Sequence, residues 1–268
     1  MHFKTISGSL CKMSKSFDEL VEIMAKLRGE AGCPWDRKQT HETLKPYLIE
    51  ESHEVLEAID KKDPAHLSEE LGDLFLQVLF HAQIAKEKGD FSIEDVLKGL
   101  ADKLTQRHPH VFGGEKAESA EEVLKNWEKN KLKEKKGKRL SYLEGVPPSL
   151  PSLMRAQKIQ KKASRAGFDW ESREGVILKF EEEWKEFEEA LNNNAPEAVE
   201  EELGDLFFTL VNLARFVKAD SEQALRNATE KFILRFQAME NELRKEGRAL
   251  DALSPAEMDA LWTRAKNQ

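Results

Sequence analysis

The chain has 268 residues, of which 34% are charged and 40% apolar, and its formal net charge is -8 at pH 7. This composition is typical of a soluble globular protein and excludes disordered and membrane-spanning chains. The acidic balance also argues against a protein that coats nucleic acid, which needs a basic surface. Two cysteines, Cys11 and Cys33, cannot build a disulfide framework, and the N-terminus lacks the apolar stretch of a signal peptide. We therefore expect a cytoplasmic protein with no membrane or nucleic-acid partner.

Apolar residues recur at helical spacing along most of the chain. In the segment 17–28, the side chains of Leu20, Ile23, Met24 and Leu27 fall on one face of a helix. The same pattern extends over 43–60, 68–89, 92–108 and 221–245. Strict alternation of β-branched residues is absent from the sequence, so the sequence predicts an all-α fold.

The heptapeptide EELGDLF occurs twice, at 69–75 and at 201–207, an offset of 132 residues. Nearby, EESHEVLEA at 50–58 matches EEWKEFEEA at 182–190 with the same offset. Because the repeated unit holds several helices and is much longer than a solenoid repeat, the sequence predicts tandem duplicated helical-bundle domains. The predicted divisions are an N-terminal domain at 1–140, a proline-containing linker at 141–151 and a C-terminal domain at 152–268.

Each copy pairs acidic residues on two consecutive helices. Glu51 and Glu54 are three residues apart, hence neighbours on one helical face, and Glu70 and Asp73 repeat this spacing on the next helix. If the two helices are antiparallel neighbours, the four carboxylates face one another and repel unless a cation lies between them. Ligation by oxygen alone selects a hard ion, Mg²⁺ first and Mn²⁺ second. The second copy supplies Glu183, Glu186, Glu202 and Asp205, and Glu50 and Glu182 stand beside the two sets as possible further ligands.

The apolar residues of EELGDLF should seat its helix against the rest of the domain. In the second copy these residues are Leu203, Leu206 and Phe207, and we expect them to be buried. Glu201 is then expected to face away from the acidic cluster, while Glu202 and Asp205 face it.

Other interpretations of the acidic residues stay open. A run of charge on a helix is usually a solvated face, although two spaced pairs duplicated in register make that reading less suitable here. Glu50 and His53 form an E-x-x-H motif of the kind that di-iron bundles use, but Lys185 replaces His53 in the second copy, which an iron site would not tolerate. A helical scaffold or regulator without catalytic activity is the alternative from another functional class.

The paired motifs, E-E-x-x-E followed by E-L-G-D-L, resemble the MazG family of nucleoside triphosphate pyrophosphohydrolases. Four flanking stretches carry the same resemblance: GCPWDRKQT at 32–40, RHPHVFG at 107–113, SLPSLMRAQKIQKKA at 149–163 and GFDW at 167–170. The resemblance implies Mg²⁺-dependent hydrolysis of nucleoside triphosphates to the monophosphate and pyrophosphate, with broad base and sugar specificity. It also implies a homodimer of helical bundles and a role in nucleotide-pool housecleaning or in stress. A dedicated dUTPase, which shares the acidic motif, is the nearest alternative enzyme.

The resemblance also assigns roles to residues of the C-terminal half. Glu183, Glu186, Glu202 and Asp205 match the family's metal ligands, and Glu182 is the candidate group to orient the attacking water or take its proton. The residues that match nucleotide contacts are Lys179, Lys231, Arg235 and Trp262. Lysine and arginine suit a triphosphate, and tryptophan can stack on a base, although packing of the C-terminal helix would equally explain the tryptophan.

The N-terminal half keeps the acidic residues but departs from the second half elsewhere. Lys103 and Arg107 are its counterparts of Lys231 and Arg235, and Trp127 is its counterpart of Trp262. Tyr47, however, stands where the second half has Lys179. We therefore expect the C-terminal domain to carry most of the activity.

Overall fold

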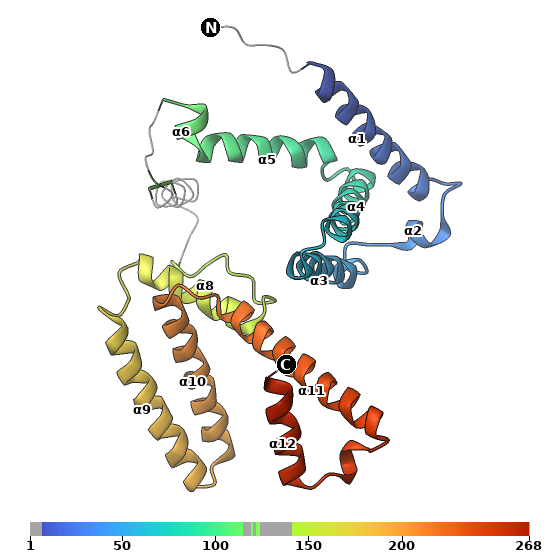
Figure 1. Ribbon diagram of the computed structural model, residues 1–268. Coiled ribbons are helices and arrows are strands. Elements are labelled where there is room, and N and C mark those ends of the chain that lie inside the picture. The colour runs from blue at the N-terminus through green and yellow to red at the C-terminus, as the bar shows by residue number, and fades with distance from the viewer. Residues whose placement is uncertain (1–6, 115–118, 120–121, 124–140, 268) are drawn as a thin grey trace. The chain divides into compact units, whose positions relative to one another are not determined.

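The structure is a computed structural model that describes residues 7–114, 119, 122–123 and 141–267 (Figure 1). Within these ranges every regular element is a helix, which confirms the predicted all-α fold. None of the described helices is long and apolar enough to cross a membrane.

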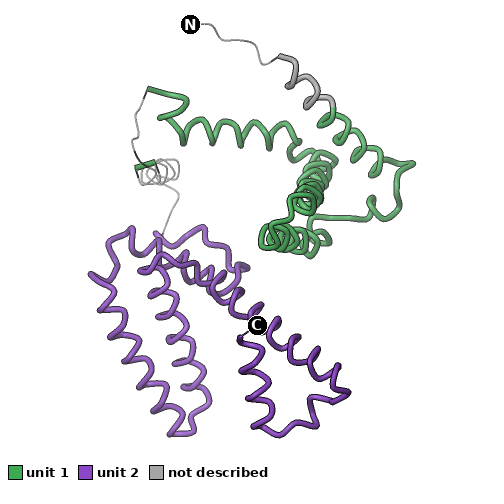
Figure 2. Tube along the Cα trace, viewed as in Figure 1, with its two compact units in different colours: residues 1–135 green, residues 136–268 purple. Residues whose placement is uncertain are grey.

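The chain divides into two compact units, residues 1–135 and 136–268, which we call unit 1 and unit 2 (Figure 2). Each unit holds one copy of the acidic repeat, as expected for a tandem duplication. The linker bounds predicted at 141–151 stay a prediction, and Trp127 lies outside the described residues.

The helices of unit 1 are α1 (Ser7–Arg28), α2 (Pro34–Lys38), α3 (Lys45–Lys61), α4 (Pro64–Lys88), α5 (Ile93–Arg107) and α6 (Pro109–Phe112). Local sequence sets several of their ends. The Asp63 carboxylate caps α4, since it accepts hydrogen bonds from the backbone N–H groups of Ala65 at 3.0 Å and His66 at 3.2 Å. Pro64 occupies the first turn of α4 because it lacks the N–H that a helix start leaves unpaired.

Helices α3 and α4 form a hairpin in unit 1, and α4 is the central helix of the unit (Figure 1). Helices α1 and α5 pack against α4 and complete the apolar core. The buried members of this core are Met24, Leu44, Leu79, Phe80, Ala82, Ile84 and Ile93. Four of them, Leu79, Phe80, Ala82 and Ile84, lie in the second half of α4 and bury one face of it. The acidic turn lies nearer the start of the same helix.

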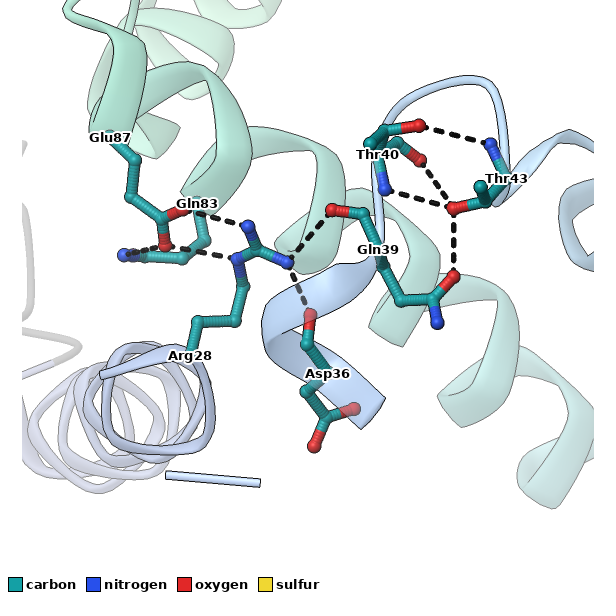
Figure 3. Close-up of polar contacts among 7 residues, drawn as sticks. All are labelled: Arg28, Asp36, Gln39, Thr40, Thr43, Gln83 and Glu87. Atoms are coloured by element: carbon teal, nitrogen blue, oxygen red, sulfur yellow. Dashed lines mark hydrogen bonds and ion pairs between the residues drawn. The ribbon is translucent and has the colours of Figure 1, made fainter. Parts of the chain in front are cut away.

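Arg28, at the end of α1, joins three parts of unit 1 (Figure 3). Its guanidinium donates to the two carboxylate oxygens of Glu87 on α4, at 2.9 and 2.7 Å, and to the backbone carbonyl oxygens of Asp36 and Gln39. The Arg28 side chain is 6% exposed whereas that of Glu87 is 37% exposed, so solvent screens the Glu87 end of this ion pair. The hydrogen bond from Arg28 lowers the pKa of Glu87 below its ordinary value.

Arg28→Met is expected to lower the free energy of unfolding of unit 1 by about 1–3 kcal/mol, because the hydrogen bonds of a buried guanidinium to Glu87 and to two backbone carbonyl oxygens are lost. Since the pKa of Glu87 is lowered in the folded state, the pair stabilises above the unfolded pKa and this contribution disappears as pH falls through the folded pKa. Urea unfolding at pH 7 and at about pH 3 should therefore show a larger effect at pH 7. The control is Arg37→Met, which removes one exposed hydrogen bond to the Glu30 carbonyl oxygen. An equal loss in both variants would contradict the prediction.

The helices of unit 2 are α8 (Ser152–Arg165), α9 (Arg173–Asn192), α10 (Pro196–Phe216), α11 (Ser221–Glu246), the 3₁₀ turn η1 (Leu250–Ala252) and α12 (Pro255–Lys266). A tight connection at Asn193–Ala195 joins α9 and α10 into a hairpin (Figure 1). Asn194 adopts a left-handed conformation there, with φ of 51°, which asparagine tolerates better than most residues. Helix α8 packs against both α10 and α11.

A separate apolar cluster joins α11 and α12. Its buried members are Met239, Leu243, Leu253, Leu261 and Ala265. Trp262 is partly buried against this cluster, and its ring centroid lies 5.3 Å from that of Phe232. Packing of the C-terminal helix, one of the two explanations that the sequence leaves open for Trp262, is thus part of its role in unit 2.

The expected burial of the apolar residues in EELGDLF is only partly correct for α10. Leu206 is 5% exposed, whereas Leu203 is 38% exposed and Phe207 is 52% exposed. Leu203 and Phe207, four residues apart, share a helical face with Leu210, which is 44% exposed. The neighbouring helices of unit 2 leave this apolar stripe, Leu203, Phe207 and Leu210, open to solvent.

Candidate functional site

The two hairpins bring together the acidic residues that the repeat singles out. In unit 1, carboxylate oxygens of Glu51 on α3 and of Glu70 and Asp73 on α4 all lie within 4.8 Å of one another. In unit 2, oxygens of Glu183, Glu202 and Asp205 lie within the same distance of one another. We call these three-residue groups the unit 1 and unit 2 clusters. Glu54 and Glu186, the fourth predicted members of the two sets, are not among these groups but lie close enough for their charges to act on Glu51 and Glu202.

One carboxyl in each cluster, Glu51 in unit 1 and Glu202 in unit 2, has a raised pKa because it is partly buried beside other carboxylates. Burial, followed by the charges of Asp73 and Glu54, raises the pKa of Glu51. Burial, followed by the charges of Glu186 and Glu183, raises the pKa of Glu202. A divalent cation between the carboxylates would relieve their repulsion. Carboxylate oxygens are the ligands that hard ions such as Mg²⁺ prefer. The donor set therefore fits the predicted metal, while the role of these residues as ligands stays a prediction.

Lys179 on α9 stands against the unit 2 cluster. Its Nζ atom lies 2.8 Å from an oxygen of Glu183 and 2.7 Å from an oxygen of Glu182. Hydrogen bonds to Glu182 and Glu183 raise the pKa of Lys179, so the ammonium keeps its charge. The predicted base Glu182 is exposed, and this contact holds its carboxylate beside the cluster.

Unit 1 has a different partner at its cluster. His66 Nε2 lies 2.9 Å from an oxygen of Glu70, whereas Ala198 occupies the equivalent position in unit 2. Spacing along the helix, since His66 and Glu70 are four residues apart, could have identified this contact. His53 is exposed and lies outside the described cluster of unit 1, as does Glu50, so the E-x-x-H motif does not form a metal site there.

Aromatic packing replaces Lys179 in unit 1. The Trp35 ring meets Tyr47 edge-on, with ring centroids 5.9 Å apart, and meets Phe80 edge-on at 6.4 Å. Tyr47 holds the position that Lys179 holds in unit 2. Trp35 of the CPWD motif therefore packs against Tyr47, the residue at which the first half departs from the second. Unit 1 presents aromatic rings where unit 2 presents an ammonium group.

A cavity of about 590 Å³ adjoins the unit 2 cluster. Helices α8, α9 and α10, the loop before α9 and Leu143, which precedes α8, supply its walls. Lys179, Glu183 and Asp205 line it together with residues that the sequence analysis missed, namely Gln160, Phe168, Asp169, Trp170, Asn212 and Arg215. The GFDW motif at 167–170 was the available signal, since it supplies three of the missed residues.

Lys231 and Arg235, predicted to contact the nucleotide, line a second cavity of about 530 Å³ between α11 and α12. This cavity has no lining residue in common with the cavity at the unit 2 cluster. The Arg235 guanidinium lies 5.9 Å from the Trp262 ring centroid, so these two residues are neighbours on α11 and α12. Within unit 2 the structure therefore places the predicted nucleotide contacts in two groups.

The remaining predicted residues lie on α5 and at its end. Lys103 is exposed and Arg107 is half-buried. Helix α5 ends at Arg107, two residues before Pro109, which could not continue it, and His108 Nδ1 lies 2.7 Å from the Leu104 carbonyl oxygen at this end. His108 is thus part of the end of α5.

Comparison with known proteins decides the family. The model of the MazG nucleotide pyrophosphohydrolase domain matches the chain twice, at residues 39–112 and 171–239. The chain belongs to the MazG family. Both matched segments contain an acidic cluster, so the duplication that the sequence predicts is a duplication of the MazG domain.

Two named relatives of similar length, one from Thermotoga maritima and one from Escherichia coli, support this assignment. "Nucleoside triphosphate pyrophosphohydrolase/pyrophosphatase MazG" of Thermotoga maritima is 52% identical over 93% of this chain and 95% of its own length. "Nucleoside triphosphate pyrophosphohydrolase" of Escherichia coli is 45% identical over 94% of this chain and 97% of its own length. The solved structure of a mazG-related protein from Thermotoga maritima is 36% identical, covers 43% of this chain and 98% of that one, and has a TM-score of 0.38. As a member of a hydrolase family, the chain is an enzyme rather than a non-catalytic scaffold.

Proposed function

We propose that this protein hydrolyses nucleoside triphosphates to the nucleoside monophosphate and pyrophosphate, with Mg²⁺ as its cofactor, or Mn²⁺ in its place. The observation that carries the proposal is the unit 2 cluster, three carboxylates within 4.8 Å of one another beside a charged lysine and a cavity. A MazG domain spans this cluster. Nucleotide-pool housecleaning or a stress response in the cytoplasm is part of the same proposal.

In the proposed mechanism, Glu183, Glu186, Glu202 and Asp205 hold the metal. A bound Mg²⁺ would neutralise phosphate charge and lower the pKa of a water. Lys179 binds the triphosphate through its ammonium, which moves from the carboxylates toward the incoming anion. Glu182 then accepts the proton of the attacking water. A bond forms between the water oxygen and the α-phosphorus, and the bond from that phosphorus to the leaving pyrophosphate breaks.

The choice between a broad enzyme and a dedicated dUTPase is tested with the eight common ribo- and deoxyribonucleoside triphosphates and with dUTP. Pyrophosphate release is measured for each substrate with Mg²⁺ and again with excess chelator. We expect turnover of several bases and both sugars that depends on the metal. Turnover of dUTP alone would support the dUTPase alternative, and equal turnover in chelator would overturn the proposal of a metal cofactor.

We also propose a homodimer. The apolar stripe of Leu203, Phe207 and Leu210 lies open in unit 2 and needs a cover. Lys231 and Arg235 line a cavity apart from the cluster of their own chain, and a second copy can bring them to it. Analytical ultracentrifugation should show a dimer that dissociates more readily in Phe207→Glu. The control is Glu201→Gln, which replaces an exposed carboxylate of the same helix by an uncharged amide and should leave the dimer unchanged. A monomer of full activity would contradict this proposal.

A further inference from the structure

Helix α8 differs from the other helices around the unit 2 cluster in its charge. Its sequence, SLMRAQKIQKKASR, holds five lysine and arginine residues and no aspartate or glutamate. Helices α9 and α10, which carry the cluster, hold twelve acidic residues against four basic ones. The whole chain has a net charge of -8. Positive charge concentrated on one helix of an acidic protein gives that helix a local field of the opposite sign.

The five cations lie on one side of α8, which we call the basic face. At about 100° per residue, they fall within roughly a third of the helix circumference. Four of them are exposed and the fourth in chain order is half-buried. The members of the basic face are Arg155, Lys158, Lys161, Lys162 and Arg165. Packing does not explain this face, because the buried residues of α8, Gln157 and Gln160, lie outside its arc.

Three members of the basic face keep their charge free of acidic partners. Arg155, Lys158 and Lys161 form no ion pair or side-chain hydrogen bond with the described residues. Other exposed basic residues of unit 2 do pair, since Arg248 contacts Glu257 at 2.6 Å. The charge of the basic face is therefore available to an anion from solution.

The basic face borders the cavity at the unit 2 cluster. Helix α8 lines this cavity with Ile159, Gln160 and Ala163. Ile159 lies four residues after Arg155 and three before Lys162, so the three side chains are neighbours on the helix surface. Lys162 Nζ also donates to the Glu144 carbonyl oxygen at 2.7 Å, and the residue before Glu144, Leu143, is part of the cavity wall. The positive charge thus lies at the rim of the cavity.

We propose that the basic face of α8 attracts the polyphosphate of the substrate and steers it to the unit 2 cavity. This inference rests on the proposed hydrolysis of nucleoside triphosphates. A triphosphate that approaches an acidic chain and a group of carboxylates is repelled. From Arg155 to Arg165 the basic face extends over about 15 Å of helix, more than the Debye length of about 8 Å at physiological salt. It therefore offers the anion an attractive field outside the cavity, which raises the association rate.

Unit 1 lacks a basic face on the corresponding helix. Helix α1 precedes the GCPW sequence at 32–35 as α8 precedes GFDW at 167–170. Over 17–28, however, α1 mixes three acidic residues with two basic ones. Unit 1 is also the unit in which Tyr47 stands in place of Lys179. The basic face thus occurs in the unit that has a lysine to receive the phosphates.

Association rates test the steering directly. A non-hydrolysable ATP analogue, with an imido bridge between the α- and β-phosphorus atoms and a fluorescent N-methylanthraniloyl group on the ribose, is mixed with the full chain and Mg²⁺ in a stopped-flow instrument. In Lys158→Glu/Lys161→Glu the association rate constant at about 25 mM NaCl should fall about 5–20-fold. At about 500 mM NaCl the difference should shrink to less than about twofold, because salt screens the field. The dissociation rate and kcat should change less than about twofold.

The matched control is Arg244→Glu/Lys245→Glu, the same change of charge on two exposed residues of α11. Helix α8 meets the start of α11, where the Ser221 backbone N–H donates to Gln157 Oε1 at 3.2 Å. Lys245 lies about 36 Å further along the same helix. The control variant should therefore keep the association rate of the unchanged protein within about twofold at both salt concentrations.

Four results would overturn the steering. Equal slowing in the control would mean that net charge alone sets the rate. Slowing that persists at high salt, or a fall in kcat, would mean that Lys158 and Lys161 support the fold or the chemistry. Unchanged association in Lys158→Glu/Lys161→Glu with normal hydrolysis would remove the basic face from the substrate's path and leave the proposed function intact. If the unchanged protein hydrolyses no nucleoside triphosphate, the proposed function and the steering both fail.

Discussion

Asp205→Asn and Glu202→Gln are each expected to reduce pyrophosphate release by about 10²–10⁴-fold. Both residues belong to the unit 2 cluster, where carboxylate oxygens lie within 4.8 Å of one another. A metal held there supplies several kcal/mol of charge stabilisation, and each 1.36 kcal/mol lost from it costs about a factor of ten in rate. Both changes keep size and shape and remove only charge. Initial rates of pyrophosphate formation at saturating Mg²⁺ give the measurement.

The matched controls are Asp73→Asn and Glu70→Gln, the same changes in the unit 1 cluster. We expect these variants to keep most of the activity, because Tyr47 replaces Lys179 and packs against Trp35 in unit 1. A loss in the unit 1 variants as large as that in the unit 2 variants would contradict the assignment of turnover to unit 2.

Leu44→Ala and Leu261→Ala are expected to cost about 2–5 kcal/mol each in the free energy of unfolding of the unit that contains them. Leu44 is 1% exposed in the core of unit 1, and Leu261 is 2% exposed in the core of unit 2. Removing either side chain leaves a cavity that a close-packed interior does not fill. Denaturant titrations that follow far-UV circular dichroism give the size of each change.

The two core variants also separate the roles of the units. At a denaturant concentration that unfolds unit 1 of Leu44→Ala alone, hydrolysis should persist if unit 2 carries it. A denaturant concentration that unfolds unit 2 of Leu261→Ala alone should abolish hydrolysis. Simultaneous loss of activity and of both units in Leu44→Ala would show that the units unfold together and that turnover in unit 2 needs unit 1.

The acidic clusters could be predicted from the sequence because they depend on local geometry. Residues three apart on a helix share a face, and a short connection makes two helices antiparallel neighbours, so Glu202 and Asp205 had to face α9. The duplication strengthened this prediction, since the same spacing recurs around Asp73. Family resemblance then added the metal and the substrate class.

The cavity residues could not be predicted because several elements bring them together. Gln160 comes from α8, Trp170 from a loop and Asn212 from α10, and only their packing places them around one space. Helical periodicity likewise finds the apolar face of α10 but not whether the same chain covers it, which is why Leu203 and Phe207 were wrongly expected to be buried. The five-residue helix α2 also lacked the length that gives a clear periodic pattern.

The central claim is that the unit 2 cluster uses a metal to release pyrophosphate from a nucleoside triphosphate. Its most direct test is the product analysis of one nucleoside triphosphate by ³¹P NMR, for the unchanged protein and for the double variant Glu202→Gln/Asp205→Asn, with Mg²⁺ and with excess chelator. We predict nucleoside monophosphate and pyrophosphate in equal amounts from the unchanged protein with Mg²⁺ only, and no product above background from the double variant. Nucleoside diphosphate with inorganic phosphate as products, or full activity of the double variant, would contradict the account.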